Sequence, residues 1–176
     1  MQMASVVAAG AKGIMLFQSD LTLEGSSAWK NGGKMMKMIA GIGDAHLRSA
    51  DFAGPGAFTK DDDDDASLVG VLYGPVSLTV VAISTNADSY SDVTCSVGVS
   101  NHWQFHSHTI KNLEVKLPSD WKDLSLSVQE VNHDGQLDDL QDGATAKVDD
   151  SSITIADIDF DDGPHVLARM FVITKA

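Results

Sequence analysis

Hydrophobic and polar residues alternate over much of the second half of the chain. Single polar residues separate Leu113, Val115 and Leu117, and the same spacing recurs at Leu124 and Leu126. A period of two is typical of a strand that buries one face, and aspartate, asparagine and glycine between such segments favour turns. The pattern predicts a mainly β fold, an antiparallel sandwich of about eight strands at residues 68–73, 77–84, 93–99, 110–117, 124–131, 144–148, 151–155 and 166–174.

These strands hold nearly all the strand signals of the chain, so we expect residues 66–176 to fold on their own. The expected core residues are Leu72, Val80, Val97, Val115, Leu126 and Phe171.

The first sixty residues have a different pattern, which predicts a helix, a strand and a second helix. Residues 5–9 fit the end of a helix that Gly10 terminates. Residues 12–17 form a short apolar run, typical of a strand buried on both faces. After a polar loop at 18–25, Ser26 or Ser27 can cap a helix that we expect to reach about residue 46. Its expected apolar face includes Trp29, Met36, Ile39 and Gly43.

The charge distribution places a segment boundary between residues 60 and 61. Residues 1–60 carry a net charge of +2 and residues 61–176 a net charge of −15, within a total of −13. Five consecutive aspartates, residues 61–65, follow a Gly-Pro-Gly sequence. Like charges in a run repel one another and stay hydrated. We therefore expect this run to be a solvated linker whose replacement by asparagine changes only solubility and ion-exchange behaviour.

Composition excludes several classes of protein. No apolar run approaches the ~20 residues that span a bilayer, and the negative charge would repel a phosphate backbone, so neither a membrane nor a nucleic acid is expected as partner. Cys95 is the only cysteine, which excludes an internal disulfide. Residues 1–13 have no basic residue before their apolar stretch, so a signal peptide of the usual form is not expected. A glycine-rich phosphate loop and a G-x-S-x-G motif are also absent, and we expect no cofactor.

A short segment resembles part of a known enzyme architecture. Residues 6–17, Val-Val-Ala-Ala-Gly-Ala-Lys-Gly-Ile-Met-Leu-Phe, followed by a loop and a helix that opens with Ala28-Trp-Lys, resemble the last β/α unit of a glycoside hydrolase barrel. A β-sandwich after the barrel is common in agarase-like and galactosidase-like families. The final segment, residues 163–174, is similar to the last strand of such sandwiches. The resemblance implies the C-terminal part of a glycoside hydrolase.

The same resemblance implies that this chain lacks the catalytic centre. Glycosidases use two carboxylates that flank the scissile bond, and in barrel families these follow strands that are missing here. Asp20 and Glu24 lie on the remaining barrel loop, where they are candidates for lining a substrate cleft, although loop carboxylates are more often simply solvated. We expect no hydrolytic activity from this chain and assign it no catalytic residue.

The densest polar and aromatic cluster spans residues 101–108. Trp103 could serve as a stacking platform for a sugar ring, with Asn101, Gln104 and His106 bonding its hydroxyls. The alternation of the segment equally fits a strand with Trp103 and Phe105 in the core, and this interpretation is favoured because large aromatic residues are usually buried. If the platform exists, Trp103→Ala should abolish retention on a galactan column.

Metal binding is considered and not adopted. His102, His106 and His108 share one strand face, but no fourth ligand for a zinc site is visible. Residues 130–141 place Asn132, Asp134 and Gly135 as a calcium loop would, yet the two end ligands are wrong. A hairpin turn at Asp134-Gly135 explains that segment better.

The leading hypothesis is therefore a non-catalytic C-terminal region of a glycoside hydrolase whose accessory β-sandwich contacts polysaccharide. Two alternatives stay open: a free-standing carbohydrate-binding module, and a structural or interaction β-sandwich without a ligand. An exposed Trp103 or Tyr90 beside polar groups would favour the module. The sugar, its linkage, the cellular location and the oligomeric state do not follow from the sequence.

Overall fold

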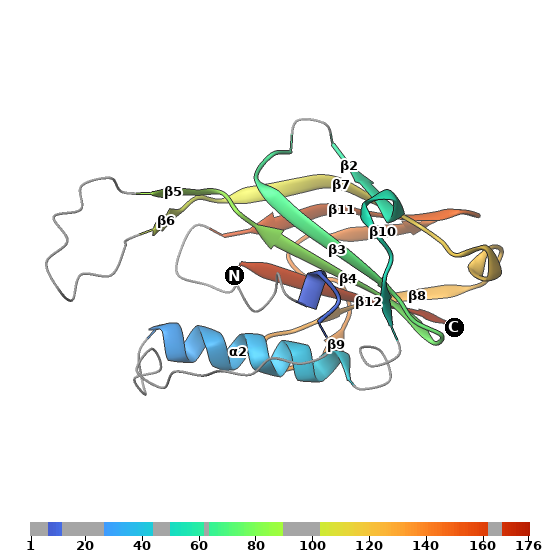
Figure 1. Ribbon diagram of the computed structural model, residues 1–176, viewed down its shortest axis with the longest axis horizontal. Helices are drawn as coiled ribbons and strands as arrows, with labels where there is room; N and C mark the ends of the chain where they lie inside the picture. Colours follow the sequence, from blue (N-terminus) through green and yellow to red (C-terminus); the bar gives the residue numbers. More distant parts are fainter. Residues whose placement is uncertain (1–6, 12–26, 44–49, 62–63, 90–102, 162–166) are drawn as a thin grey trace, which may run out of the picture.

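A computed structural model describes residues 7–11, 27–43, 50–61, 64–89, 103–161 and 167–176 of the chain. For residues 27–31, 88–89 and 103–105 it describes the backbone only. Within these residues the protein is mainly β, with antiparallel sheets and one long helix arranged in layers (Figure 1). The predicted fold class is confirmed.

The larger sheet has six strands in the order β1-β3-β4-β12-β8-β9, all paired in antiparallel fashion. Its two central strands are apolar on both faces, because one face meets the second sheet and the other meets the helix. The strands are β1 (Asp51–Phe52), β3 (Ser67–Tyr73), β4 (Ser77–Ser84), β8 (Leu126–Val131), β9 (Leu137–Asp138) and β12 (Ala168–Lys175).

The second sheet has four strands in the order β10-β11-β7-β2, and a separate two-stranded ribbon pairs β5 with β6. Single-turn 3₁₀ helices, η1 (Pro55–Ala57) and η2 (Ser119–Trp121), connect consecutive strands that lie in different sheets. The strands are β2 (Phe58–Lys60), β5 (Ala87–Ser89), β6 (Trp103–Phe105), β7 (His108–Lys116), β10 (Thr145–Val148) and β11 (Ser152–Phe160).

The main core lies between the two larger sheets. It contains Val80 and Phe171 from one sheet and Val115 and Ile155 from the other, and Trp121 of η2 is 1% exposed in the same cluster. Alternation places these side chains on the facing surfaces, as expected for a sandwich.

Most of the predicted core residues occupy buried positions. Val80, Val115 and Phe171 lie between the sheets, and Leu126 is partly buried against them. Leu72 is buried on the opposite face of its sheet, in the cluster beneath the helix. Val97 lies outside the described residues.

Strand β11 extends five residues beyond the predicted end at residue 155. Ile153 and Ile155 face the core, but so do Ile158 and Phe160, which breaks the period of two. The change occurs at Asp157, whose φ of 55° is left-handed, a conformation that aspartate tolerates. The alternation therefore fails within a strand that is continuous.

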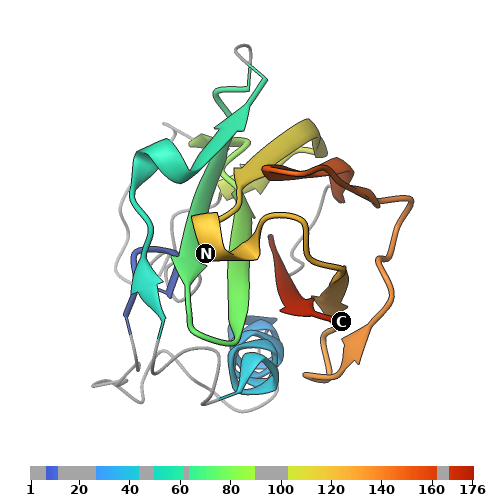
Figure 2. The ribbon, with the colours of Figure 1, turned by 90° about the vertical axis from the view of Figure 1, so that its right-hand side faces the viewer.

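Helix α2 (Ser27–Ile42) covers the outer face of the six-stranded sheet (Figures 1 and 2). The helix is shorter than predicted, because Gly43, with a φ of 80°, ends it. Its buried stripe is Met35, Met38 and Ile42, whereas Met36 is 41% exposed. Of the predicted face, Ile39 packs against the same cluster, the Trp29 side chain lies outside the description, and Met36 was wrong. Met35 and Met36 are equally apolar, so only the sheet distinguishes them.

Two close backbone contacts attach the first segment to the sheet. A Cβ at Gly70 would lie 2.2 Å from the carbonyl oxygen of Ala8, and one at Gly41 would lie 2.3 Å from that of Gly135. Only glycine permits these approaches. Gly10, with a φ of 89°, donates its backbone N–H to the carbonyl of Val7 at 2.8 Å, as predicted for a helix end.

Residues on both sides of the predicted boundary share the sheets. Strand β1 pairs with β3, and β2 pairs with β7. The predicted strands at 12–17 and 93–99 lie outside the described residues, so the barrel-like part of the first segment stays a prediction.

Candidate functional site

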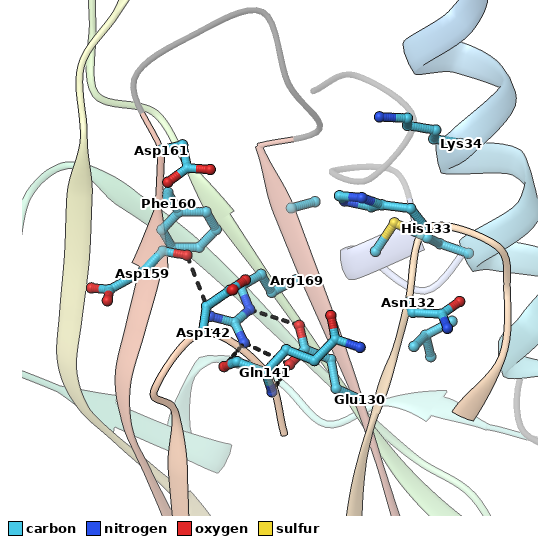
Figure 3. Close-up of a pocket in the computed structure, with 13 residues that line it drawn as sticks. Lys34, Glu130, Asn132, His133, Gln141, Asp142, Asp159, Phe160, Asp161 and Arg169 are labelled. Carbon is cyan, nitrogen blue, oxygen red and sulfur yellow. Dashed lines mark hydrogen bonds and ion pairs between the residues drawn. The ribbon is translucent and has the colours of Figure 1, made fainter. Parts of the chain in front are cut away.

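A polar cavity of about 200 Å³ opens at one end of the sandwich (Figure 3). It lies between α2, the turn after β8, the end of β11 and the start of β12. The helix, the turn and the β11–β12 pair are far apart in the sequence. Strands β8 and β12 are neighbours in the six-stranded sheet, and α2 packs across that sheet. The layered fold thus brings these four segments together.

A buried ion pair forms the floor of the cavity. The Nε atom of Arg169 donates to Oε1 of Glu130 at 2.7 Å, and its Nη2 atom donates to Oε2 at 2.5 Å. Arg169 is 6% exposed and Glu130 is 5% exposed. This is the bidentate geometry that gives the strongest arginine–carboxylate contacts.

The ion pair also holds the segment that follows β9. The backbone N–H of Gln141 donates to Oε2 of Glu130 at 3.0 Å, and its carbonyl accepts from Nη2 of Arg169 at 2.7 Å. The Nη1 atom of Arg169 donates to the carbonyl of Asp159 at 3.4 Å, and the guanidinium lies 5.7 Å from the ring centre of Phe171. One arginine therefore ties together three strands and a connecting loop.

The walls of the cavity differ in chemistry. Lys34 of α2 and His133 of the turn after β8 project from one side, and Phe160 and Asp161 lie on the other (Figure 3). Hydrogen-bond donors therefore face a carboxylate and an aromatic ring across the opening.

The turn that carries His133 is held by Asn132. The backbone N–H groups of Asp134 and Gln136 both donate to Oδ1 of Asn132 at 2.9 Å, and its Nδ2 atom donates to Asp138 at 2.6 Å. This confirms the predicted hairpin turn, because the asparagine oxygen is used by backbone donors. The turn also contacts the helix through Lys37, whose Nζ atom lies 3.0 Å from Asp134. A hydrogen bond from Lys37 and its charge hold the pKa of Asp134 below its usual value.

A second polar cluster joins the two sheets behind Phe160 of the cavity wall. Oδ2 of Asp64 accepts a short hydrogen bond from the Ser67 hydroxyl, and Lys60 lies 3.4 Å away. The Nε2 atom of His108 lies 2.9 Å from Oδ1 of Asp64, at an angle unsuited to a hydrogen bond, and its ring stacks on Phe160. Burial of Asp64 opposes ionisation, but Ser67, Lys60 and His108 outweigh it and lower the pKa of Asp64.

The prediction that the aspartate run is a solvated linker was therefore wrong for two of its members. The Asp64 side chain is 6% exposed, and Asp61 accepts from the backbone N–H of Asn112 at 3.2 Å. Neighbouring strands supply the Lys60 ammonium to Asp64 and the Asn112 backbone N–H to Asp61. These two carboxylates are therefore held within the structure.

The residues that the sequence put forward for sugar binding do not form a described cluster. Asp20, Glu24 and Asn101 lie outside the described residues. Trp103 and Gln104 lie in β6, where they pair with Ser89 and Asp88 of β5, and their side chains are not described. His106 is half-buried, and its backbone N–H donates to Asn86 at 3.0 Å. The structure thus leaves that site a prediction.

Sequence reasoning missed the cavity, although two signals were present. Arg169 interrupts the apolar run of residues 167–173, and a charge at such a position needs a buried partner. Glu130, one of only three glutamates, similarly ends an alternating strand. Lys34, His133 and Asp161 gave no signal because each is an ordinary polar surface residue in the sequence.

Comparison with known proteins gives no family. The chain matches no protein-family model and no curated protein sequence. Among the described residues, no helix is both long enough and apolar enough to cross a bilayer, and no group of three or more histidine, cysteine or acidic side chains is arranged to hold a metal ion.

Proposed function

We propose that this chain is a non-catalytic, saccharide-contacting β-sandwich that serves as the accessory region of a glycoside hydrolase. The observation that carries the proposal is the polar cavity above the Arg169–Glu130 pair. The chain's resemblance to the end of a hydrolase barrel supplies the context, and a free-standing binding module would use the same cavity.

The lining of the cavity suits a molecule with many hydroxyl groups. The ammonium of Lys34 and the imidazole of His133 can bond hydroxyl oxygens, while the carboxylate of Asp161 accepts from hydroxyl hydrogens. Phe160 offers an apolar edge to the C–H groups of a ring. Drug-sized ligands occupy cavities of roughly 300–1,000 Å³, so a cavity of about 200 Å³ suits one sugar ring.

Binding of neutral mono- and oligosaccharides to the full chain tests the proposal. Titration calorimetry with galactose and agar oligosaccharides should give saturable binding, and His133→Ala and Asp161→Ala should each weaken it at least fivefold. Both residues are exposed, so circular dichroism should be unchanged. Asp150→Ala, an exposed aspartate outside the cavity, is the matched control.

The other outcomes distinguish the remaining hypotheses. If Trp103→Ala abolishes binding while the cavity variants do not, the sugar site is the one predicted at residues 101–106. Release of reducing sugar by the pure protein would contradict a non-catalytic role. Failure of every saccharide to bind would overturn the proposal.

A structural sandwich without a ligand is the second candidate, and one observation favours it. The Arg169–Glu130 pair that forms the cavity floor already bonds Gln141 and Asp159, so its polar atoms have hydrogen-bond partners within the protein and need no ligand. In that case the cavity is a solvated gap between the helix and the sheet, no saccharide would bind, and the cavity variants would leave the stability unchanged.

A further inference from the structure

The charges around the cavity are unequal. Among the described residues that line it, Asp142, Asp159 and Asp161 supply three carboxylates and Lys34 the one ammonium group, beside the imidazole of His133. The ion pair of the floor is neutral as a unit. Figure 3 shows Asp159 turned away from the opening, and its Oδ1 atom accepts from Thr109 at 2.5 Å. Two nearer carboxylates therefore outweigh one ammonium group.

From this imbalance we infer that the cavity selects among sugars by charge, preferring a protonated amino sugar to a neutral sugar and a neutral sugar to a uronate. The inference rests on the proposed function, because it names the ligand class of the same cavity. The overall charge of −13 acts in the same direction at long range.

The expected size of the preference follows from Coulomb's law. At a separation of about 6 Å in water, one net charge changes the affinity for a singly charged ligand about threefold. A net charge of −1 near the opening therefore separates an amino sugar from a uronate by about tenfold. Screening by salt should reduce this ratio, because the Debye length shortens from about 30 Å at 0.01 M to about 8 Å at 0.15 M.

Galactosamine, galactose and galacturonate test the inference because they share a ring and differ in charge. A sugar amine with a pKa close to that of an α-amino group, about 8, is mostly protonated at pH 7. Ligand-observed NMR titrations of the full chain in about 10 mM salt should give affinities in the order amine, neutral, acid.

Single-charge variants locate the source of the order. Asp161→Asn should make the three affinities nearly equal. Asp142→Asn combined with Asp161→Asn should reverse their order, because the positive charge of Lys34 then exceeds the negative charge near the opening. Asp150→Asn removes the same total charge from an exposed position outside the cavity and should leave the tenfold ratio intact.

The outcomes separate this inference from the proposed function. Binding of galactose with a flat or inverted charge order in the unaltered protein overturns the inference alone. An order that survives in the doubly substituted protein also overturns it, because the cavity carboxylates are then not its source. If none of the three sugars binds, the proposed function fails as well.

Discussion

Removal of the Arg169 guanidinium should destabilise the protein more than any other single polar substitution among the described residues. In Arg169→Met the Glu130 carboxylate, 5% exposed, keeps only the backbone N–H of Gln141 as a partner. The carbonyls of Gln141 and Asp159 lose a donor at the same time. A buried charge is thereby left without its counter-charge.

The magnitude follows from the cost of breaking a buried ion pair. Loss of one partner costs about 3–5 kcal/mol because the remaining charge is desolvated and uncompensated. Replacing both partners, as in Glu130→Leu with Arg169→Met, removes that charge and leaves mainly the lost bonds to Gln141, at about 1 kcal/mol each. The double variant should therefore be more stable than either single variant, at a cost of about 2 kcal/mol.

Urea denaturation at pH 7, followed by far-ultraviolet circular dichroism, measures these free energies of unfolding. The comparison requires equal m-values, since a change in m would indicate a change in the unfolded or native ensemble. Typical domains have about 5–15 kcal/mol of stability, so each variant should remain measurable. The reasoning is refuted if the two single costs add, within about 0.5 kcal/mol, to that of the double variant.

Three further predictions concern the attachment of the first segment and the joint between the sheets. Gly70→Ala places a Cβ 2.2 Å from the carbonyl of Ala8 and should cost about 1–3 kcal/mol in urea unfolding, whereas Gly56→Ala, with open space around it, should cost little. Because the pKa of Asp64 is lowered on folding, its contribution to stability is present above the unfolded pKa of about 3.9 and is lost as pH falls toward the folded pKa. In Asp64→Asn the urea midpoint should therefore fall less steeply with decreasing pH in this acid range. An unchanged fall would contradict the prediction. A chain reduced to residues 66–176 lacks the helix and exposes the apolar sheet face beneath it, so light scattering should detect aggregation. This differs from the expectation from sequence that residues 66–176 fold on their own. A soluble fragment that unfolds cooperatively would show that the helix is dispensable.

The fold class could be predicted because a period of two survives in most strands. The alternation failed at Asp157, where a residue in the left-handed conformation changes which side chains face the core. The buried face of the helix could not be predicted, because Met35 and Met36 are equally apolar and the choice depends on the sheet. Tertiary contact decided each of these points.

The candidate site depends on contacts that no local pattern contains. Lys34, Glu130, Asp161 and Arg169 are brought together by strand order and helix packing. Asp64 showed the same limit, since its neighbours in the sequence indicated repulsion while Lys60 and His108 provide attraction across strands. Only the charges within predicted strands, at Arg169 and Glu130, were visible in advance.

The lengths of the outermost strands bear on how the protein avoids self-association. In the described part of the chain, the sheets end in strands of two to four residues, β1, β9, β2 and β10, beside inner strands of six to nine. Unpaired backbone groups along a long outer strand would accept a strand from another molecule, and a short one offers such a strand few bonds. Proteolytic loss of residues 51–60 would therefore uncover the backbone groups of β3 and β7 that now pair with β1 and β2, and would favour fibre-like stacking of otherwise folded molecules.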